Sequence, residues 1–159
     1  MTNLKLLFKR PLRAVPNNII IGALIVALIG FADAVYLTLE RYQGVIPPCS
    51  ITGGCEAVLT SAYATIAGIP VSLLGVLFYL VILIGLFAYL ESKNTKILKW
   101  TLFLTAFGFL SSLWFVFLQA FVIHAYCAYC LFSALTSTVL FICALVVFSK
   151  YSTPDTLPE

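Results

Sequence analysis

Charged residues are scarce in this sequence. Only 9% of its 159 residues are Asp, Glu, Lys or Arg, whereas 62% are hydrophobic. A soluble domain carries about a quarter charged residues, so most of this chain must face lipid or other apolar helices. The only histidine is His124, and there is no C-x-x-C-H haem signature, flavin fingerprint or intramembrane histidine pair. These absences leave haem and flavin chemistry without the residues that they need.

Four long apolar runs account for this composition. Each has about 20 residues or more, which is enough to cross a hydrocarbon core of roughly 30 Å. The runs lie at about 19–39, 71–90, 97–123 and 125–148. We therefore predict an all-α membrane protein whose four-helix bundle occupies residues 18–149. A basic lead, residues 1–17, precedes the bundle, and a polar tail, residues 150–159, follows it.

Basic residues are distributed unevenly around these runs. Eight of the nine lie before the first run, between the second and third, or after the fourth, and only Arg41 lies in the loop 40–67. Because Lys and Arg favour the cytoplasmic side, we expect both termini in the cytoplasm and the loop 40–67 outside. The charges flank spans and form no separate basic domain, so nucleic-acid binding is not indicated.

The first run has one competing interpretation. Basic residues followed by apolar ones and by Ala32-Asp33-Ala34 are also typical of a signal peptide with its cleavage site. The apolar run continues through Leu39, which favours a complete span. Asp33 itself is either a functional intramembrane carboxylate or a group that hydrogen-bonds at the interface.

Cysteines are the candidate reactive residues. Cys127 and Cys130 form a C-x-x-C pair where an apolar run resumes, and a helix there puts both thiols on one face of its first turn. The free N–H groups and the dipole of a helix start stabilise a thiolate. Cys49 and Cys55 flank Gly53-Gly54, and they can close a small disulfide ring.

The charge-derived topology places both cysteine pairs on the outer side, where disulfides persist in a bacterium. A short surface helix is expected over 56–66, after the loop pair. A pair on a flexible loop and a pair at a rigid helix start suit a thiol–disulfide relay. With haem and flavin signatures absent, a quinone in the bilayer is the predicted electron acceptor.

Two other classes of protein remain open at this point. Four cysteines can bind zinc as a structural Cys₄ site, although the C-x5-C spacing is longer than usual. A small transporter or scaffold with structural disulfides is the second alternative. His124 is either a proton relay near the thiols or an ordinary turn residue at the interface.

The order of the motifs resembles the vitamin K epoxide reductase family, in its bacterial branch. The resemblance covers about 19–148. The matching residues are Cys49, Cys55-Glu56, Val58, Ser61, Tyr63, Gly68-Ile69-Pro70, Gly75, Cys127 and Cys130.

This resemblance implies a mechanism in which Cys130 engages the quinone. Cys127 and Cys130 then form one redox disulfide, and Cys49 and Cys55 form the other. Cys55 exchanges with Cys127 through a transient disulfide, and the loop pair accepts electrons from a thioredoxin-like protein. Ser61 matches a family residue implicated in quinone reduction.

The quinone pocket implied by the resemblance includes Val71, Leu74 and Ala134. Val71 and Ala134 stand where the animal enzymes have asparagine and tyrosine, which favours ordinary quinone reduction over vitamin K epoxide chemistry. Many bacterial members carry a fused thioredoxin-like domain, and this sequence ends at Glu159 without one. We therefore expect either a separate partner or a sequence that is part of a longer protein.

The sequence therefore predicts a membrane thiol–disulfide:quinone oxidoreductase of the bacterial inner membrane. It is expected to reoxidise a thioredoxin-like or DsbA-like periplasmic protein and to reduce ubiquinone or menaquinone, without a metal.

Overall fold

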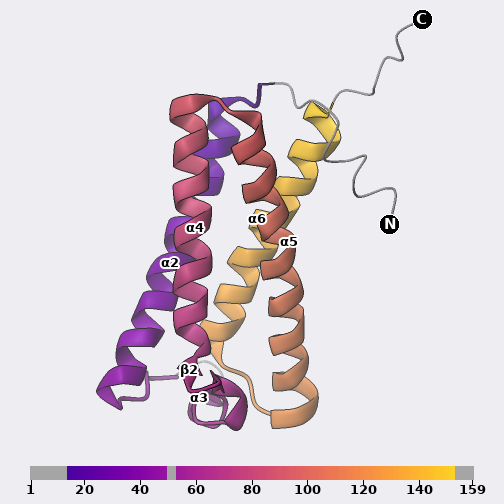
Figure 1. The fold of residues 1–159 in the computed structure, drawn as a ribbon. Coiled ribbons are helices and arrows are strands. Elements are labelled where there is room, and N and C mark those ends of the chain that lie inside the picture. Colours follow the sequence, from indigo (N-terminus) through magenta and orange to yellow (C-terminus); the bar gives the residue numbers. More distant parts are fainter. Residues whose placement is uncertain (1–13, 50–52, 153–159) are drawn as a thin grey trace, which may run out of the picture.

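The computed structural model describes residues 14–49 and 53–152, and four long helices make up most of this part. The helices are α2 (Asn17–Gln43), α4 (Val71–Ser92), α5 (Thr95–Leu118) and α6 (Ala128–Tyr151). They stand side by side in an antiparallel bundle (Figure 1). Each is long and apolar enough to cross a membrane. These observations confirm the predicted all-α, four-helix membrane fold.

Small residues let the helices approach closely. Gly30 of α2 lies against the Tyr79 ring of α4 and the Thr136 hydroxyl of α6, where an added Cβ would clash. Gly108 of α5 lies in the same way against the Phe78 ring of α4. Close approach at glycine is a common means of packing helices in membranes. The Tyr79 hydroxyl, in the centre of the bundle, donates to the Ser133 carbonyl at 2.9 Å.

Local signals at the helix ends explain where the spans stop. Gly44, with φ of 69°, ends α2 in the left-handed conformation, which glycine adopts without strain. Asn94 caps α5, and its side chain accepts the N–H of Lys96 at 3.0 Å. Pro70 directly precedes α4. Helix α2 extends beyond its apolar run at both ends, α4 begins with its run at Val71, and α6 begins three residues after its run does.

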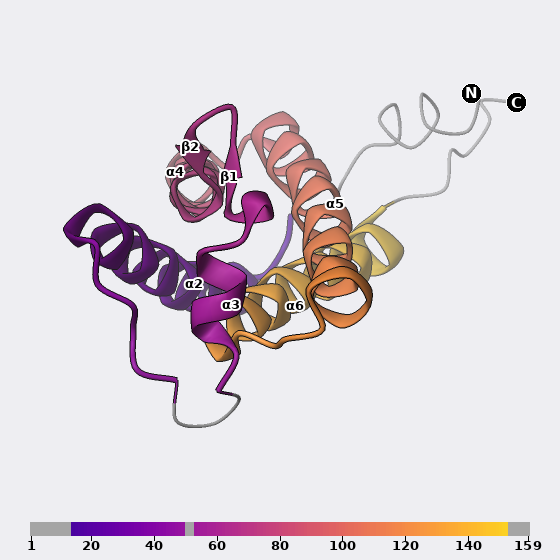
Figure 2. The same cartoon turned by 90° about the horizontal axis from the view of Figure 1, so that it is seen from below.

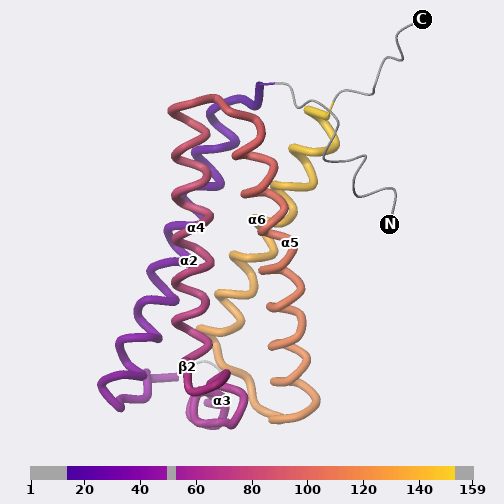
Figure 3. The backbone as a smooth tube through the Cα atoms, viewed as in Figure 1, coloured from indigo at the N-terminus to yellow at the C-terminus, as the bar shows by residue number. Residues whose placement is uncertain are grey.

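The two ends of the bundle differ in structure (Figure 3). At one end lie the start of α2, the α4–α5 connection and the end of α6. At the other lie the end of α2, the start of α6 and the segment that joins α2 to α4. Lys93, Lys96 and Lys150 belong to the first end and Arg41 to the second.

The α2–α4 connection contains the short helix α3 (Cys55–Leu59), a 3₁₀ turn (Ala62–Ala64) and a hairpin of β1 (Thr65–Ile66) with β2 (Ile69–Pro70). Figure 2 shows α3 lying across the end of the bundle, over α2 and α6.

The predicted extent of the surface helix, 56–66, is wrong beyond Leu59. Ser61 turns the chain into an extended conformation with ψ of 157°. Ala67 and Gly68 have positive φ values of 51° and 82° and form the hairpin turn. The β-branched Thr65 and Ile66 precede that turn, where they favour a strand.

Candidate functional site

All four predicted redox cysteines lie at the α3 end of the bundle. Cys55 and Cys127 are fully buried and share one apolar cluster with Val58. Cys49 and Cys130 pack against the same cluster. The structure thus brings the loop pair and the C-x-x-C pair together, although they are far apart in the sequence.

The two pairs differ in how their sulfurs are arranged. Cys49 and Cys55 form a disulfide, whereas Cys127 and Cys130 are free thiols. The segment before Cys49 is held to α6, because the Tyr129 hydroxyl donates to the Pro48 carbonyl at 3.3 Å. The Tyr129 ring also contacts the Tyr36 ring of α2, with centroids 5.4 Å apart.

Gly54 sets the distance between the two pairs. A Cβ at this position would lie 2.7 Å from the Tyr126 carbonyl oxygen and 2.8 Å from its backbone nitrogen. Real Cβ atoms do not approach backbone atoms so closely. Glycine therefore lets the start of α3 lie directly on the chain that leads into Cys127.

Cys127 caps helix α6 instead of lying in its first turn. The helix begins at Ala128, three residues after the predicted start, and Cys127 has an extended conformation with φ of −99° and ψ of 118°. Its Sγ accepts the backbone N–H of Cys130 at 3.4 Å. An Ncap side chain normally accepts such an N–H, and here the acceptor is the reactive sulfur.

This geometry stabilises the thiolate of Cys127. The hydrogen bond from the Cys130 thiol, with help from the backbone N–H groups of Cys130 and Tyr129, lowers the pKa of Cys127 to about 7. Burial and the charge of Asp33 oppose this shift. A thiol with such a pKa is extensively ionised at neutral pH, as reactive cysteines are.

Gln119 is a site residue that the sequence analysis missed. Helix α5 ends in a π-helical turn, Gln119–Ile123, and the Gln119 side chain is only 2% exposed. Its Oε1 accepts the N–H of Cys127 at 2.8 Å, and its main-chain carbonyl accepts the N–H of Ala125 at 3.1 Å. A single residue thus fixes the backbone before the C-x-x-C pair. The only indication of this residue in the sequence was a polar amide side chain near the end of an apolar run.

A cavity of about 450 Å³ lies beside the cysteines, between the four long helices and the α2–α4 connection. That volume is typical of small-molecule sites. Cys130 lines the cavity, whereas Cys127 is not part of its lining. The predicted pocket residues Val71, Leu74 and Ala134 all line it, as does Ser61. The Ser61 hydroxyl donates to the Val58 carbonyl at 2.7 Å.

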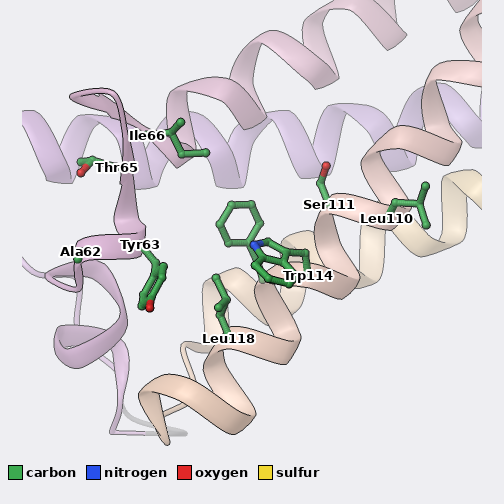
Figure 4. A pocket seen from close by; sticks show the side chains of 9 residues that line it. Ala62, Tyr63, Thr65, Ile66, Leu110, Ser111, Trp114 and Leu118 are labelled. Carbon is green, nitrogen blue, oxygen red and sulfur yellow. The ribbon is translucent and has the colours of Figure 1, made fainter.

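A second hollow of about 420 Å³ adjoins this cavity and shares five lining residues with it, Tyr63, Ile66, Ser111, Phe115 and Leu118. Figure 4 shows Tyr63 and Ile66 on one side of the hollow and side chains of α5 on the other. Its α5 wall includes Trp114, which is 58% exposed on the side of the bundle. The hollow thus lies between the wall that it shares with the cavity and the apolar side of α5.

The remaining candidate groups are Asp33 and His124. Asp33 lies within α2, and its buried Oδ2 has no hydrogen-bond partner among residues 14–49 and 53–152. His124 is exposed and has a left-handed conformation at the end of the π-helical turn. Within the described residues, no three His, Cys, Asp or Glu side chains are placed to hold a metal ion.

In this bundle a disulfide packs against the C-x-x-C cysteines, and an apolar cavity lies beside them. This is the architecture of a membrane thiol–disulfide oxidoreductase. A sequence model of the vitamin K epoxide reductase family matches residues 21–145. The chain belongs to this family, which comprises membrane oxidoreductases of disulfide and quinone chemistry. A search of curated proteins finds none that matches this chain.

Proposed function

We propose that this protein oxidises the dithiol of a thioredoxin-like partner and passes the electrons to a membrane quinone. The observation that carries the proposal is the burial of Cys55 against Cys127, with Cys130 on the wall of the cavity. One sulfur of the C-x-x-C pair therefore meets the loop disulfide, and the other meets the space for an acceptor.

The first step takes place at the loop disulfide. Cys55 is fully buried, whereas Cys49 is only partly buried, so the partner's thiolate attacks the sulfur of Cys49. Cys55 leaves as a thiolate, and the partner's second thiol then releases Cys49. The partner becomes a disulfide, and the loop pair becomes a dithiol. The sulfur that an attacking thiolate can reach is one of the factors that determine the course of thiol–disulfide exchange.

The second step moves two electrons inward. The Cys55 thiolate attacks Cys127 in a Cys127–Cys130 disulfide, and Cys130 leaves. Cys49 then attacks Cys55, the loop disulfide reforms and Cys127 leaves. A leaving thiol of low pKa accelerates this exchange, and the pKa of Cys127 is about 7.

The third step takes place in the cavity. The Cys127 thiolate and the Cys130 thiol together lose two electrons and one proton, and a disulfide bond forms between them. The quinone gains both electrons, the proton of Cys130 and one proton from water, and leaves as the quinol. Ubiquinone and menaquinone both live in the bilayer, and the hollow beside Trp114 supports sideways entry from it.

The orientation of the protein in the membrane follows from the distribution of its basic residues. Lys93, Lys96 and Lys150 lie at the end of the bundle opposite to the cysteines. By the positive-inside rule, the cysteines then face the periplasm of a bacterial inner membrane, and both termini face the cytoplasm. A separate thioredoxin-like or DsbA-like protein can reach Cys49 from that side.

The test is turnover of the purified protein with a reduced thioredoxin-like donor and a soluble quinone. The wild type should reduce quinone, Cys130→Ala should not, and Cys143→Ala serves as the control because Cys143 lies within α6 away from the site. If the wild type is inactive and one zinc ion per chain copurifies, the cysteines form a structural site and the proposal is wrong.

A further inference from the structure

One hydroxyl in the cavity wall is unsatisfied. Ser137 of α6 lines the cavity and is only 3% exposed. Its Oγ has no hydrogen-bond partner in the part of the chain that the structure describes, residues 14–49 and 53–152. A buried hydroxyl without a partner is unfavourable and uncommon, so its position calls for an explanation.

The local acceptors of Ser137 are already occupied. A serine within a helix usually donates to the carbonyl three or four residues earlier. The Ser133 carbonyl accepts the hydroxyls of Tyr79 and Thr136, each at 2.9 Å. The Ala134 carbonyl accepts the hydroxyl of Thr138 at 2.7 Å. Within α6 each of these carbonyls also accepts the backbone N–H of the residue four positions later. A carbonyl oxygen has two lone pairs, so neither has room for Ser137 as well.

Ser137 shares a helix face with the thiol that lines the cavity. Cys130, Ala134 and Ser137 are spaced at i, i+4 and i+7, which places them on one side of α6. All three line the cavity. With the rise of an α-helix, Ser137 lies about 10 Å deeper in the bundle than Cys130. The methyl group of Ala134 separates the thiol from the hydroxyl.

This arrangement fits a flat ring with an acceptor oxygen at each of two opposite edges. The ring lies against Ala134, one edge faces the Cys130 sulfur, and the other edge faces the Ser137 hydroxyl. Ser61 is less suited to donate, because its hydroxyl proton is already engaged with the Val58 carbonyl at 2.7 Å. A quinone oxygen only accepts hydrogen bonds, and Ser137 has the free donor.

We propose that Ser137 donates a hydrogen bond to the quinone oxygen remote from Cys130. The inference rests on the proposed function and specifies how a para-quinone is bound. Ser137 keeps its proton throughout, since the quinol takes one proton from the Cys130 thiol and the other from water. Its hydrogen bond orients the ring and stabilises the negative charge that develops on the remote oxygen as electrons arrive.

The test compares Ser137→Ala with Thr138→Ala, using a para-naphthoquinone and its ortho isomer as substrates. Thr138 is the matched control, because its hydroxyl bonds to the helix backbone and it does not belong to the cavity lining. We expect Ser137→Ala to lower kcat/KM for the para isomer about tenfold, as for the loss of one buried hydrogen bond. The ortho isomer carries its oxygens side by side, so its reduction should be unchanged.

A readout independent of turnover is the carbonyl stretch of an isotope-labelled para-quinone bound to the protein. The wild type and Thr138→Ala should lower the frequency of one carbonyl, and Ser137→Ala should restore it. If Ser137→Ala matches Thr138→Ala in both measurements while the wild type reduces quinone, the inference is wrong and the proposed function stands. If the wild type reduces no quinone, the proposed function is wrong, and if its bound para-quinone also shows no lowered carbonyl frequency, the inference is wrong as well.

Discussion

At the scale of single residues, Cys127 combines three roles. It caps α6 with its sulfur, it is buried against Cys55, and its backbone N–H is held by Gln119. The C-x-x-C spacing was enough to predict a stabilised thiolate at a helix start. It could not reveal that the first cysteine is the cap, because that depends on where the preceding turn delivers the chain.

The Cys127 thiolate gives the first prediction. In reduced Cys49→Ala/Cys55→Ala protein, the ultraviolet thiolate absorbance should increase as the pH rises through about 7, the pKa of Cys127. A further Cys130→Ala change should move this step up toward about 8.5, because the bond from the Cys130 thiol is the largest cause of the shift. If the step stays near neutral pH in that variant, the Cys130 bond does not stabilise the thiolate.

Gln119 gives the second prediction. Gln119→Met keeps the length of the side chain but removes the oxygen that accepts the Cys127 N–H. A buried N–H left without a partner costs about 1–3 kcal/mol, so the free energy of unfolding should fall by this amount and exchange between Cys55 and Cys127 should slow. The control is Gln43→Met, at an exposed glutamine. Equal stability and exchange rate in the two variants would refute this role.

At the scale of elements, the apolar runs predicted the four helices, because hydrophobic length is what the bilayer requires. The helix ends and the α2–α4 connection were predicted less well. The π-helical turn depends on contacts between Gln119 and residues near Cys127. The early end of α3 depends on the hairpin that follows it. Such contacts leave no periodic pattern in a sequence.

The contact of α3 with the chain before Cys127 gives the third prediction. Gly54→Ala should slow the exchange between Cys55 and Cys127 at least about tenfold, because the added methyl group must push α3 away from Tyr126. Single-turnover quinone reduction by the pre-reduced C-x-x-C pair should be unchanged. Gly22→Ala is the control, since its Cβ would meet open space. Unchanged exchange in Gly54→Ala would show that this contact does not set the rate.

At the scale of the whole molecule, the order of the membrane spans predicted where the site lies. The spans and the distribution of basic residues gave a topology without reference to cysteine, and that topology placed all four cysteines at one end of the bundle. The cavity was predicted only in part. Ser137 gave no signal, because its unsatisfied hydroxyl becomes visible only when the partners of Ser133 and Ala134 are known.

The orientation in the membrane gives the fourth prediction. In a cysteine-free background, Gln43→Cys and Ser92→Cys place single exposed thiols at opposite ends of the bundle. A membrane-impermeant maleimide added to intact bacterial cells with a permeable outer membrane should label the first and not the second. Labelling of Ser92→Cys alone would mean that the cysteines face the cytoplasm.

The central claim is that electrons pass from the loop pair through the C-x-x-C pair to a quinone. The most direct test is anaerobic quinone reduction by pre-reduced protein, with the wild type beside Cys130→Ala and Cys49→Ala. The wild type should reduce quinone, and Cys130→Ala should not. Cys49→Ala should do so once and then fail to be recharged by a thioredoxin-like donor. If Cys130→Ala reduces quinone as well as the wild type, or if all three proteins are equally inert, the relay does not exist.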